Sequence, residues 1–141
     1  MVDALGNERL FGLLKTALDA SSMGHQMNAA NVANIDTPGY VARRMDFENI
    51  MRDFSDKEAM QHESPLKGGH SRSLPRPAVL NYQDYVVEED TGHLTERFDG
   101  NNVDIDKEMA AMAKMRGRFQ LASQLMNKKV HLINEVIMSG R

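Results

Sequence analysis

The 141-residue sequence has no cysteine and no tryptophan, and its aromatic residues are only five phenylalanines and three tyrosines. Without cysteine the chain forms no disulfide and carries out no thiol chemistry. Its first residues show no basic segment followed by an apolar run, so we expect no cleaved signal peptide. No stretch approaches the 18 or so apolar residues of a membrane span. If the chain leaves the cytoplasm, it uses a route that cleaves no signal.

A strong charge of either sign is also missing. The formal net charge is −3, and no basic face of the kind that binds nucleic acid stands out. Charge is instead patterned locally, since residues 65–77 are basic without an acid and residues 84–99 are mostly acidic. These stretches either pair with each other, within a subunit or between neighbours, or form two solvated loops, and the sequence leaves both interpretations open.

The sequence contains no motif typical of catalysis, cofactor binding or metal binding. The five histidines lie far apart and have no partner at metal-ligand spacing. There is no nucleophile elbow and no phosphate-binding glycine loop. Residues 99–106 superficially resemble a calcium loop, but they lack its ligand spacing and closing glutamate, which favours a turn followed by a helix cap. We therefore predict a protein that is not an enzyme and has no cofactor, metal or small-molecule substrate.

The first third of the chain predicts one long helix, from about residue 7, with Asn7 as N-cap, to residue 34. A line of residues with alternating spacings of four and three follows it, which is heptad spacing. We call this line the N-terminal seam; it consists of Leu10, Leu14, Ala17, Ser21, Gly24, Asn28, Asn31 and Ile35. Its second half is small and polar, which allows another helix to approach closely and favours one register. The alternative is a surface helix of a small bundle with a weak second half.

The last third predicts a second long helix, over residues 104–138, with Asp104 as N-cap and acids in the first turn. The C-terminal seam follows the same spacing through Met109, Met112, Arg116, Phe119, Ser123, Met126, Val130, Ile133 and Ile137. Such a helix is about 52 Å long, which is too long for a compact domain of this size unless the first helix lies along it. We therefore expect the two terminal helices to form an antiparallel coiled-coil hairpin.

The middle of the chain predicts irregular structure. Residues 41–60 favour a short helix or an extended arm, residues 61–77 a flexible loop, and residues 78–87 one or two short strands. The expected fold is mainly α. It has one structural domain with three segments: the N-terminal coiled-coil helix (1–35), an irregular, loop-rich and possibly short-stranded middle (36–103), and the C-terminal coiled-coil helix (104–141).

One segment, at the exit of the first helix, is unusually specific. Pro38 followed by Gly39 is typical of a type II turn, and Tyr40 provides an aromatic anchor after it. The segment resembles the N-terminal signature of the flagellar rod and hook axial protein family, which matches here at Asn31, Ala33, Asn34, Thr37, Pro38, Gly39 and Tyr40. Residues 99–109 and 127–129 are similar to the proximal-rod members of that family. The resemblance covers about residues 10–54 and 94–138.

The resemblance implies a structural subunit of the bacterial flagellar basal-body rod, which is needed for motility. Such subunits are exported by the flagellar type III apparatus, take their place in the rod that crosses the periplasm, and polymerise through their terminal helices, so that both seams would serve folding and assembly. The implied partners are other copies, other rod proteins, an inner-ring adaptor of the FliE type and, transiently, the export gate. The alternative is a cytoplasmic helical-hairpin export chaperone or adaptor that does not polymerise, although such a hairpin does not need so specific a helix exit.

Phe47 and Met51 form a possible export element. The segment is similar to the short phenylalanine-containing element that early export substrates of this family present to the export gate. The same spacing is common, and it also describes one apolar face of a short helix. The sequence leaves both interpretations open.

Overall fold

A computed structural model describes residues 4–63, 80–88 and 98–139. The elements in chain order are α1 (Ala4–Ala33), β1 (Arg43–Met45), α2 (Phe47–Glu63), the 3₁₀ helix η1 (Tyr82–Tyr85), β2 (Val86–Glu88) and α3 (Ile105–Ser139). Within these ranges, no helix is both long and apolar enough to cross a membrane.

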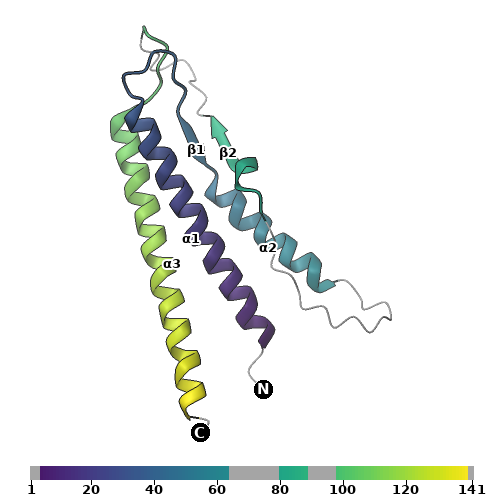
Figure 1. Ribbon diagram of the computed structural model, residues 1–141. Coiled ribbons are helices and arrows are strands. Elements are labelled where there is room, and N and C mark those ends of the chain that lie inside the picture. The colour runs from purple at the N-terminus through teal and green to yellow at the C-terminus, as the bar shows by residue number, and fades with distance from the viewer. Residues whose placement is uncertain (1–3, 64–79, 89–97, 140–141) are drawn as a thin grey trace.

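The two terminal helices run antiparallel along each other, and α1 occupies the middle of the molecule (Figure 1). It packs against α3 on one side and against α2 and β1 on the other. The expected mainly α fold is confirmed, with long terminal helices and a loop-rich middle that contains a short two-stranded sheet. Asn7, expected as the N-cap, lies inside α1, which begins at Ala4.

Small and polar side chains allow α1 to approach α3 closely. Leu14, Ser21, Gly24, Asn28 and Asn31 of the N-terminal seam are buried. A Cβ atom at Gly24 would lie 3.1 Å from the sulfur of Met115. Any larger residue at this position would therefore force the methionine side chain to move. The heptad spacing in this helix therefore marks a real packing line.

The main apolar core lies on the opposite side of α1. Ala20, Met45, Ile50, Phe54 and Leu80 form a buried cluster there. In α2, apolar residues at positions 47, 50, 51 and 54 follow helical spacing, and the helix begins after Asp46, whose carboxylate accepts a bond from the backbone N–H of Asn49 at 3.0 Å. Packing on this core explains why a mainly polar segment forms a helix.

The middle segment is more regular than the sequence predicts. Residues 41–60, expected as a short helix or an arm, contain β1 and most of a 17-residue helix. That helix includes residues 61–63 of the expected loop, whereas residues 64–77 lie outside the described residues. Of residues 78–87, expected as one or two short strands, residues 82–85 form the 3₁₀ helix η1 instead, and only residues 86 and 87 lie in a strand, β2. This strand pairs antiparallel with β1 and places Arg43 opposite Glu88.

Candidate functional site

The two motif-bearing segments of the chain meet at the end of the helix pair. We call this contact the motif junction; it is formed by residues 31–44 and 99–108. Asn101 is fully buried, and its side-chain nitrogen lies 2.8–3.0 Å from the carbonyl oxygens of Asn34, Ile35 and Thr37. These carbonyls belong to the residues that follow α1, and the side chain that reaches them lies 64–67 residues further along the sequence. Thus Asn101 fixes the path of the backbone after the end of α1.

Two glycines with left-handed backbone conformations face each other at this junction. Gly39 has φ +70° and Gly100 has φ +73°. The N–H of Tyr40 donates to the carbonyl of Thr37 at 3.3 Å, which with Pro38 and the positive φ of Gly39 fits the predicted type II turn. The N–H of Gly39 donates to the carbonyl of Asp99 at 2.8 Å, so this turn is tied directly to the segment before α3.

Asn31 is the centre of a buried polar network. Its amide nitrogen donates to the carbonyl of Arg43 at 2.8 Å and to the carboxylate of Glu108 at 3.1 Å. Its amide oxygen accepts from the hydroxyl of Tyr40 and from the N–H of Arg43, both at 3.1 Å. Both donor positions and both acceptor positions of the amide are therefore used. One side chain joins α1, β1 and α3.

The carboxylate of Glu108 is completely buried in α3. Besides the bond from Asn31, it pairs with the guanidinium of Arg44 at 3.4 Å. A buried carboxylate is unfavourable unless it is paired and hydrogen-bonded, and both conditions are met only when α1, β1 and α3 are in their native places. The pair therefore stabilises this register above others.

The remaining motif residues have smaller roles. The side chain of Asn34 donates to the carbonyl of Ala30 at 2.8 Å and accepts from the hydroxyl of Thr37 at 3.2 Å. Ala33 and Pro38 are exposed. Of the seven positions of the N-terminal signature, one is the buried centre, two are half-buried and the other four are exposed.

Asn101, Glu108 and Arg44 hold the junction together, and the sequence alone does not identify them. Asn101 stands in the turn-rich segment before α3, and the sequence shows Glu108 only as one of the acids near the start of this helix, where they suit the helix dipole. The expected cap of α3 is present, since the carboxylate of Asp104 accepts from the N–H groups of residues 106 and 107 at 3.0 and 3.4 Å. The one sequence feature that points to this contact is an acid in the C-terminal helix that could reach the polar half of the N-terminal seam.

The C-terminal seam lies beside the buried line of α3. Buried positions are Glu108, Met115 and Ala122, which are seven residues apart. The seam is displaced from this line by about one residue, so Met112, Ser123, Met126 and Ile133 are half-buried. Its other members are exposed: Met109, Arg116, Phe119, Val130 and Ile137. In the N-terminal seam, Leu14 is buried, Ala17 and Ile35 are half-buried and Leu10 is exposed.

The possible export element lies at the start of α2. Phe47 and Met51 are half-buried on the face of α2 that bears Ile50. The guanidinium of Arg118 lies 4.0 Å above the ring of Phe47, a cation–π contact from α3. In the folded chain Phe47 is thus engaged by the apolar core and by Arg118, whereas Met51 is half-buried.

Tyr85 has a strongly shifted pKa. The hydroxyl of Tyr85 donates to Asp53 at 2.9 Å; burial and this acidic partner raise the pKa of Tyr85 to about 12, which keeps the phenol protonated. In the described part of the chain, no group of three or more histidines and acids is placed to hold a metal ion.

Comparison with known proteins gives consistent results. No family model matches the chain. The chain is 30% identical to the flagellar basal body rod protein FlgB of Bacillus subtilis, over 91% of its own length and 92% of the relative. It is 29% identical to the protein of that name from Proteus mirabilis, over 99% of this chain and the whole relative. The protein of that name from Escherichia coli is 28% identical, over 88% of this chain and 89% of the relative.

Proposed function

Because this chain belongs to the FlgB family of flagellar basal-body rod proteins, we propose that it is exported unfolded by the flagellar type III apparatus and polymerises through its terminal helices. Its structural role in the rod follows from the family. The resemblance drawn from the residue motifs is thereby confirmed. Export and polymerisation are supported by the following features of the molecule.

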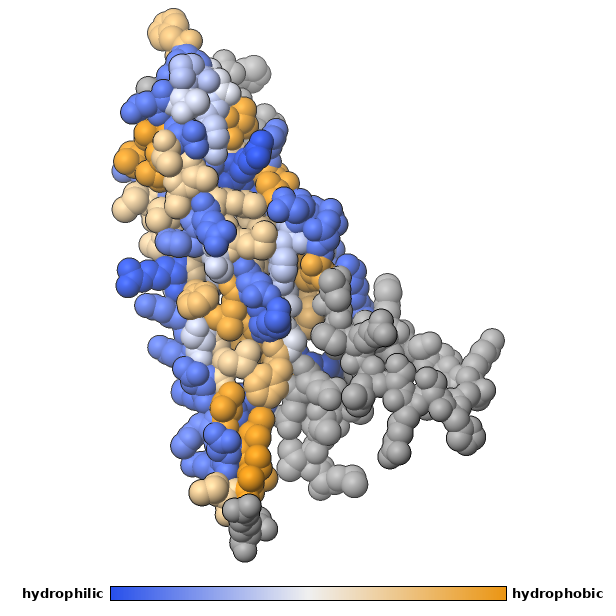
Figure 2. All heavy atoms as spheres, viewed as in Figure 1, coloured by the Kyte–Doolittle hydropathy of each residue, from blue (hydrophilic) through white to orange (hydrophobic). Residues whose placement is uncertain are grey.

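The observation that carries the polymerisation proposal is the large apolar surface of α3. Ten large apolar side chains of this helix are at least 44% exposed. They are Ile105, Met109, Phe119, Leu121, Leu125, Val130, Leu132, Val136, Ile137 and Met138. Figure 2 shows apolar side chains over the lower half of the helix pair. A surface of this kind is unfavourable in water and is typical of a face that neighbours cover.

These side chains lie on both flanks of the buried line of α3. Exposed members of the C-terminal seam flank it on one side, whereas Leu121, Leu125 and Leu132 flank it on the other. Phe119 also borders a hollow of about 370 Å³ that Ser21, His25 and Met115 help to line. A subunit with two apolar flanks can contact a neighbour on each side, which is what a closed or helical polymer requires.

The packing of Phe47 supports export of an unfolded chain. Phe47 packs against the apolar core and lies under Arg118 in the folded molecule, so an export gate would bind it more readily before folding. The buried polar network supports the same order of events, because it forms only after the two ends of the sequence have met. Folding would then follow export, and burial of the apolar flanks between neighbours would complete it.

The proposed place of the subunit is the rod where it crosses the periplasm. Its proposed partners are other copies, other rod proteins and an inner-ring adaptor of the FliE type, with the export gate as a transient partner. The proposed assembly surface consists of the exposed members of the two seams on one flank, together with Leu121, Leu125 and Leu132 on the other. No catalysis takes part in this function.

The test is a double substitution on the exposed part of the C-terminal seam. Val130→Asp with Ile137→Asp should leave export unchanged but remove the chain from purified basal bodies and abolish swimming. The matched control is Gln120→Asp with Gln124→Asp, which adds the same charge to exposed polar positions of the same helix. The control should swim as the unaltered strain does.

Retained swimming by the Val130→Asp, Ile137→Asp variant would contradict the proposed assembly surface. The alternative, a cytoplasmic export chaperone or adaptor, makes a different prediction. It would be favoured if the unaltered chain stayed in the cytoplasm and was absent from intact basal bodies.

A further inference from the structure

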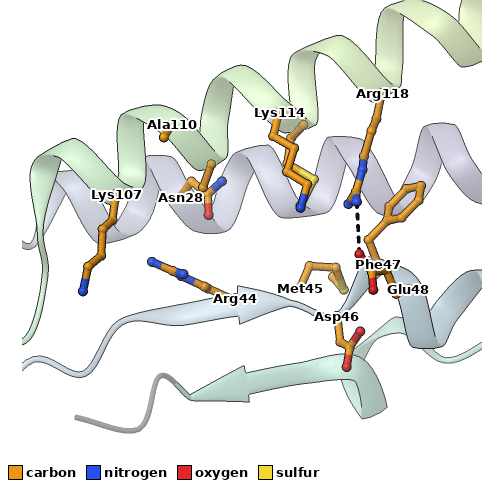
Figure 3. Close-up of a pocket in the computed structure, with 12 residues that line it drawn as sticks. Asn28, Arg44, Met45, Asp46, Phe47, Glu48, Lys107, Ala110, Lys114 and Arg118 are labelled. Carbon is orange, nitrogen blue, oxygen red and sulfur yellow. Dashed lines mark ion pairs between the residues drawn. The ribbon is translucent and has the colours of Figure 1, made fainter. Parts of the chain in front are cut away.

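A groove with a basic rim lies between the first half of α3 and the chain that joins β1 to α2. We call it the basic groove; it encloses about 440 Å³ and is lined mainly by Arg44, Met45, Phe47, Lys107, Lys114 and Arg118. Figure 3 shows the side chains of Lys107, Lys114 and Arg118 extending from α3 toward β1 and the start of α2, with Arg44 reaching back from β1. Positively charged side chains from two elements therefore border one hollow.

The two arginines of the groove are held in place by their neighbours. The guanidinium of Arg118 lies 4.0 Å from the ring of Phe47 and 3.6 Å from the carboxylate of Glu48. The guanidinium of Arg44 pairs with the buried carboxylate of Glu108 at 3.4 Å. Both arginines are therefore positioned before a ligand binds, which reduces the conformational entropy that binding would cost.

The two lysines of the groove have no such partners. The described residues provide no ion pair for the ammonium groups of Lys107 and Lys114. Asp46, an acid of the lining, accepts bonds from Asn49 as the cap of α2, and Figure 3 shows its carboxylate pointing away from the groove. The two lysines thus leave a positive charge that a ligand with at least two negative charges would match.

The floor of the groove contains a buried amide. Asn28 of α1 is part of the lining but only 2% exposed, and its side-chain nitrogen has no hydrogen-bond partner among the described residues. An unpaired buried donor is unfavourable, and a bound ion is one of the usual reasons for such a group. The nitrogen and oxygen of an amide exchange places by a half-turn of its last bond, so the donor can face an anion in the groove.

We propose that the basic groove binds an anion that contains two or more linked phosphate groups. Lys107 and Lys114 are seven residues apart on one face of α3, which is about 10 Å along the helix axis, so a ligand that meets both lysines is elongated. Linked phosphates have this shape and carry several negative charges. This inference does not depend on assembly of the subunit.

The kinds of donor in the groove favour phosphate over carboxylate. A phosphate group has more acceptor oxygens than a carboxylate, so one ligand can accept from ammonium, guanidinium and amide donors together. Guanidinium groups bind phosphate well, and the two arginines are already fixed in the wall. Two sources offer linked phosphates: inorganic diphosphate or its longer forms, and the phosphate chain of a nucleotide.

Isothermal titration calorimetry of the purified full chain at low ionic strength tests the site. The probes are inorganic diphosphate and ADP, and the comparison ligands are inorganic monophosphate, citrate and hexaglutamate. We expect one diphosphate per chain, bound at least about tenfold more tightly than any comparison ligand. Equal affinity for the two probes would assign the site to inorganic phosphates, whereas tighter binding of ADP would assign it to a nucleotide; either result supports the proposal.

A double substitution tests whether binding takes place in the groove. Lys107→Gln with Lys114→Gln should weaken the binding of diphosphate at least about tenfold. The matched control, Lys57→Gln with Lys128→Gln, changes the net charge equally at exposed lysines outside the groove and should bind as the unaltered chain does. Circular dichroism checks that both variants fold.

The unaltered chain provides a further test that needs no variant. Diphosphate should give the amide of Asn28 a hydrogen-bond partner, so the side-chain amide resonances of this residue should move during an NMR titration. A general attraction between a basic surface and an anion would leave this buried amide unaffected.

Four results would overturn the proposal. They are absence of binding of both probes, equal affinity of the groove variant and the control, and amide resonances of Asn28 that do not move. The fourth is binding of citrate or hexaglutamate as tight as that of diphosphate, which would indicate that the groove receives carboxylates.

Discussion

Replacement of Asn31 by alanine should be among the most destabilising single changes at the motif junction. The substitution removes four hydrogen bonds from a fully buried amide. Water can reach the backbone of Arg43, an exposed residue, and the hydroxyl of Tyr40, which is half-buried. The carboxylate of Glu108 cannot be compensated in this way, because it is completely buried and keeps only its pair with Arg44.

The magnitude follows from those partners. Loss of a donor to a buried charged group costs about 1.5–3 kcal/mol, and each of the more accessible bonds adds about 0.5 kcal/mol. We therefore expect Asn31→Ala to lower the free energy of unfolding by about 3 kcal/mol. Asn34→Ala is the matched control, because it removes the same type of side chain from the same motif but breaks only two exposed hydrogen bonds. It should cost about 1 kcal/mol.

Urea unfolding followed by far-UV circular dichroism measures both variants. With a slope of about 2 kcal/mol per M, Asn31→Ala should lower the midpoint by about 1.5 M and Asn34→Ala by about 0.5 M. Asn31→Asp should be no better than alanine at neutral pH, because it places a second carboxylate against that of Glu108. Equal midpoints for the two alanine variants would refute the idea that Asn31 fixes the junction.

Three further predictions concern packing, turn geometry and pH. Gly12→Ala should lower the free energy of unfolding by about 1–3 kcal/mol, because the new Cβ would lie 2.8 Å from the ring of Phe54. Gly117→Ala should raise it by about 0.5–1 kcal/mol, because nothing lies within 4 Å of the new Cβ. Thermal unfolding distinguishes the decrease expected for the first variant from the increase expected for the second. Gly39→Ala should cost about 1–2 kcal/mol in the same assay because alanine is strained at φ +70°. The pKa of Tyr85 is about 12 in the folded chain and about 10 in the unfolded chain. The stability that this difference contributes is therefore present below pH 10 and is lost as the pH rises toward 12. Tyr85→Phe should flatten the dependence of the free energy of unfolding on pH over that interval.

Heptad spacing identified the contact face of α1 better than that of α3. In α1 only one line combines regular spacing with residues small enough for a close helix, and Leu14, Gly24 and Asn31 on that line are buried. In α3, apolar residues occupy a much wider arc, so several adjacent lines satisfy the same spacing. The line of α3 that is actually buried contains Glu108. An acid is not expected at a buried position unless its partners, which lie 64 and 77 residues away in the sequence, are already known.

The turn after α1 was predictable because its geometry is local. Pro38 and Gly39 determine it through their own backbone preferences. What binds the turn was not predictable, because Asn101 reaches it from the segment before α3. The helix α2 was uncertain for a similar reason, since its few apolar side chains gain their burial from α1, from β1 and from the segment that contains Leu80 and η1.

The two ends of the helix pair have different roles. Close to the motif junction, polar side chains of α1 face a buried acid of α3, and only one register satisfies their hydrogen bonds. Toward the other end, α3 exposes the apolar side chains that we assign to neighbouring subunits. Because register is set at one end and the proposed assembly surface lies at the other, changes at Val130 and Ile137 should leave the junction intact. A variant that loses assembly but keeps the unfolding midpoint of the unaltered chain would therefore report on contacts between subunits, whereas Asn31→Ala should shift that midpoint.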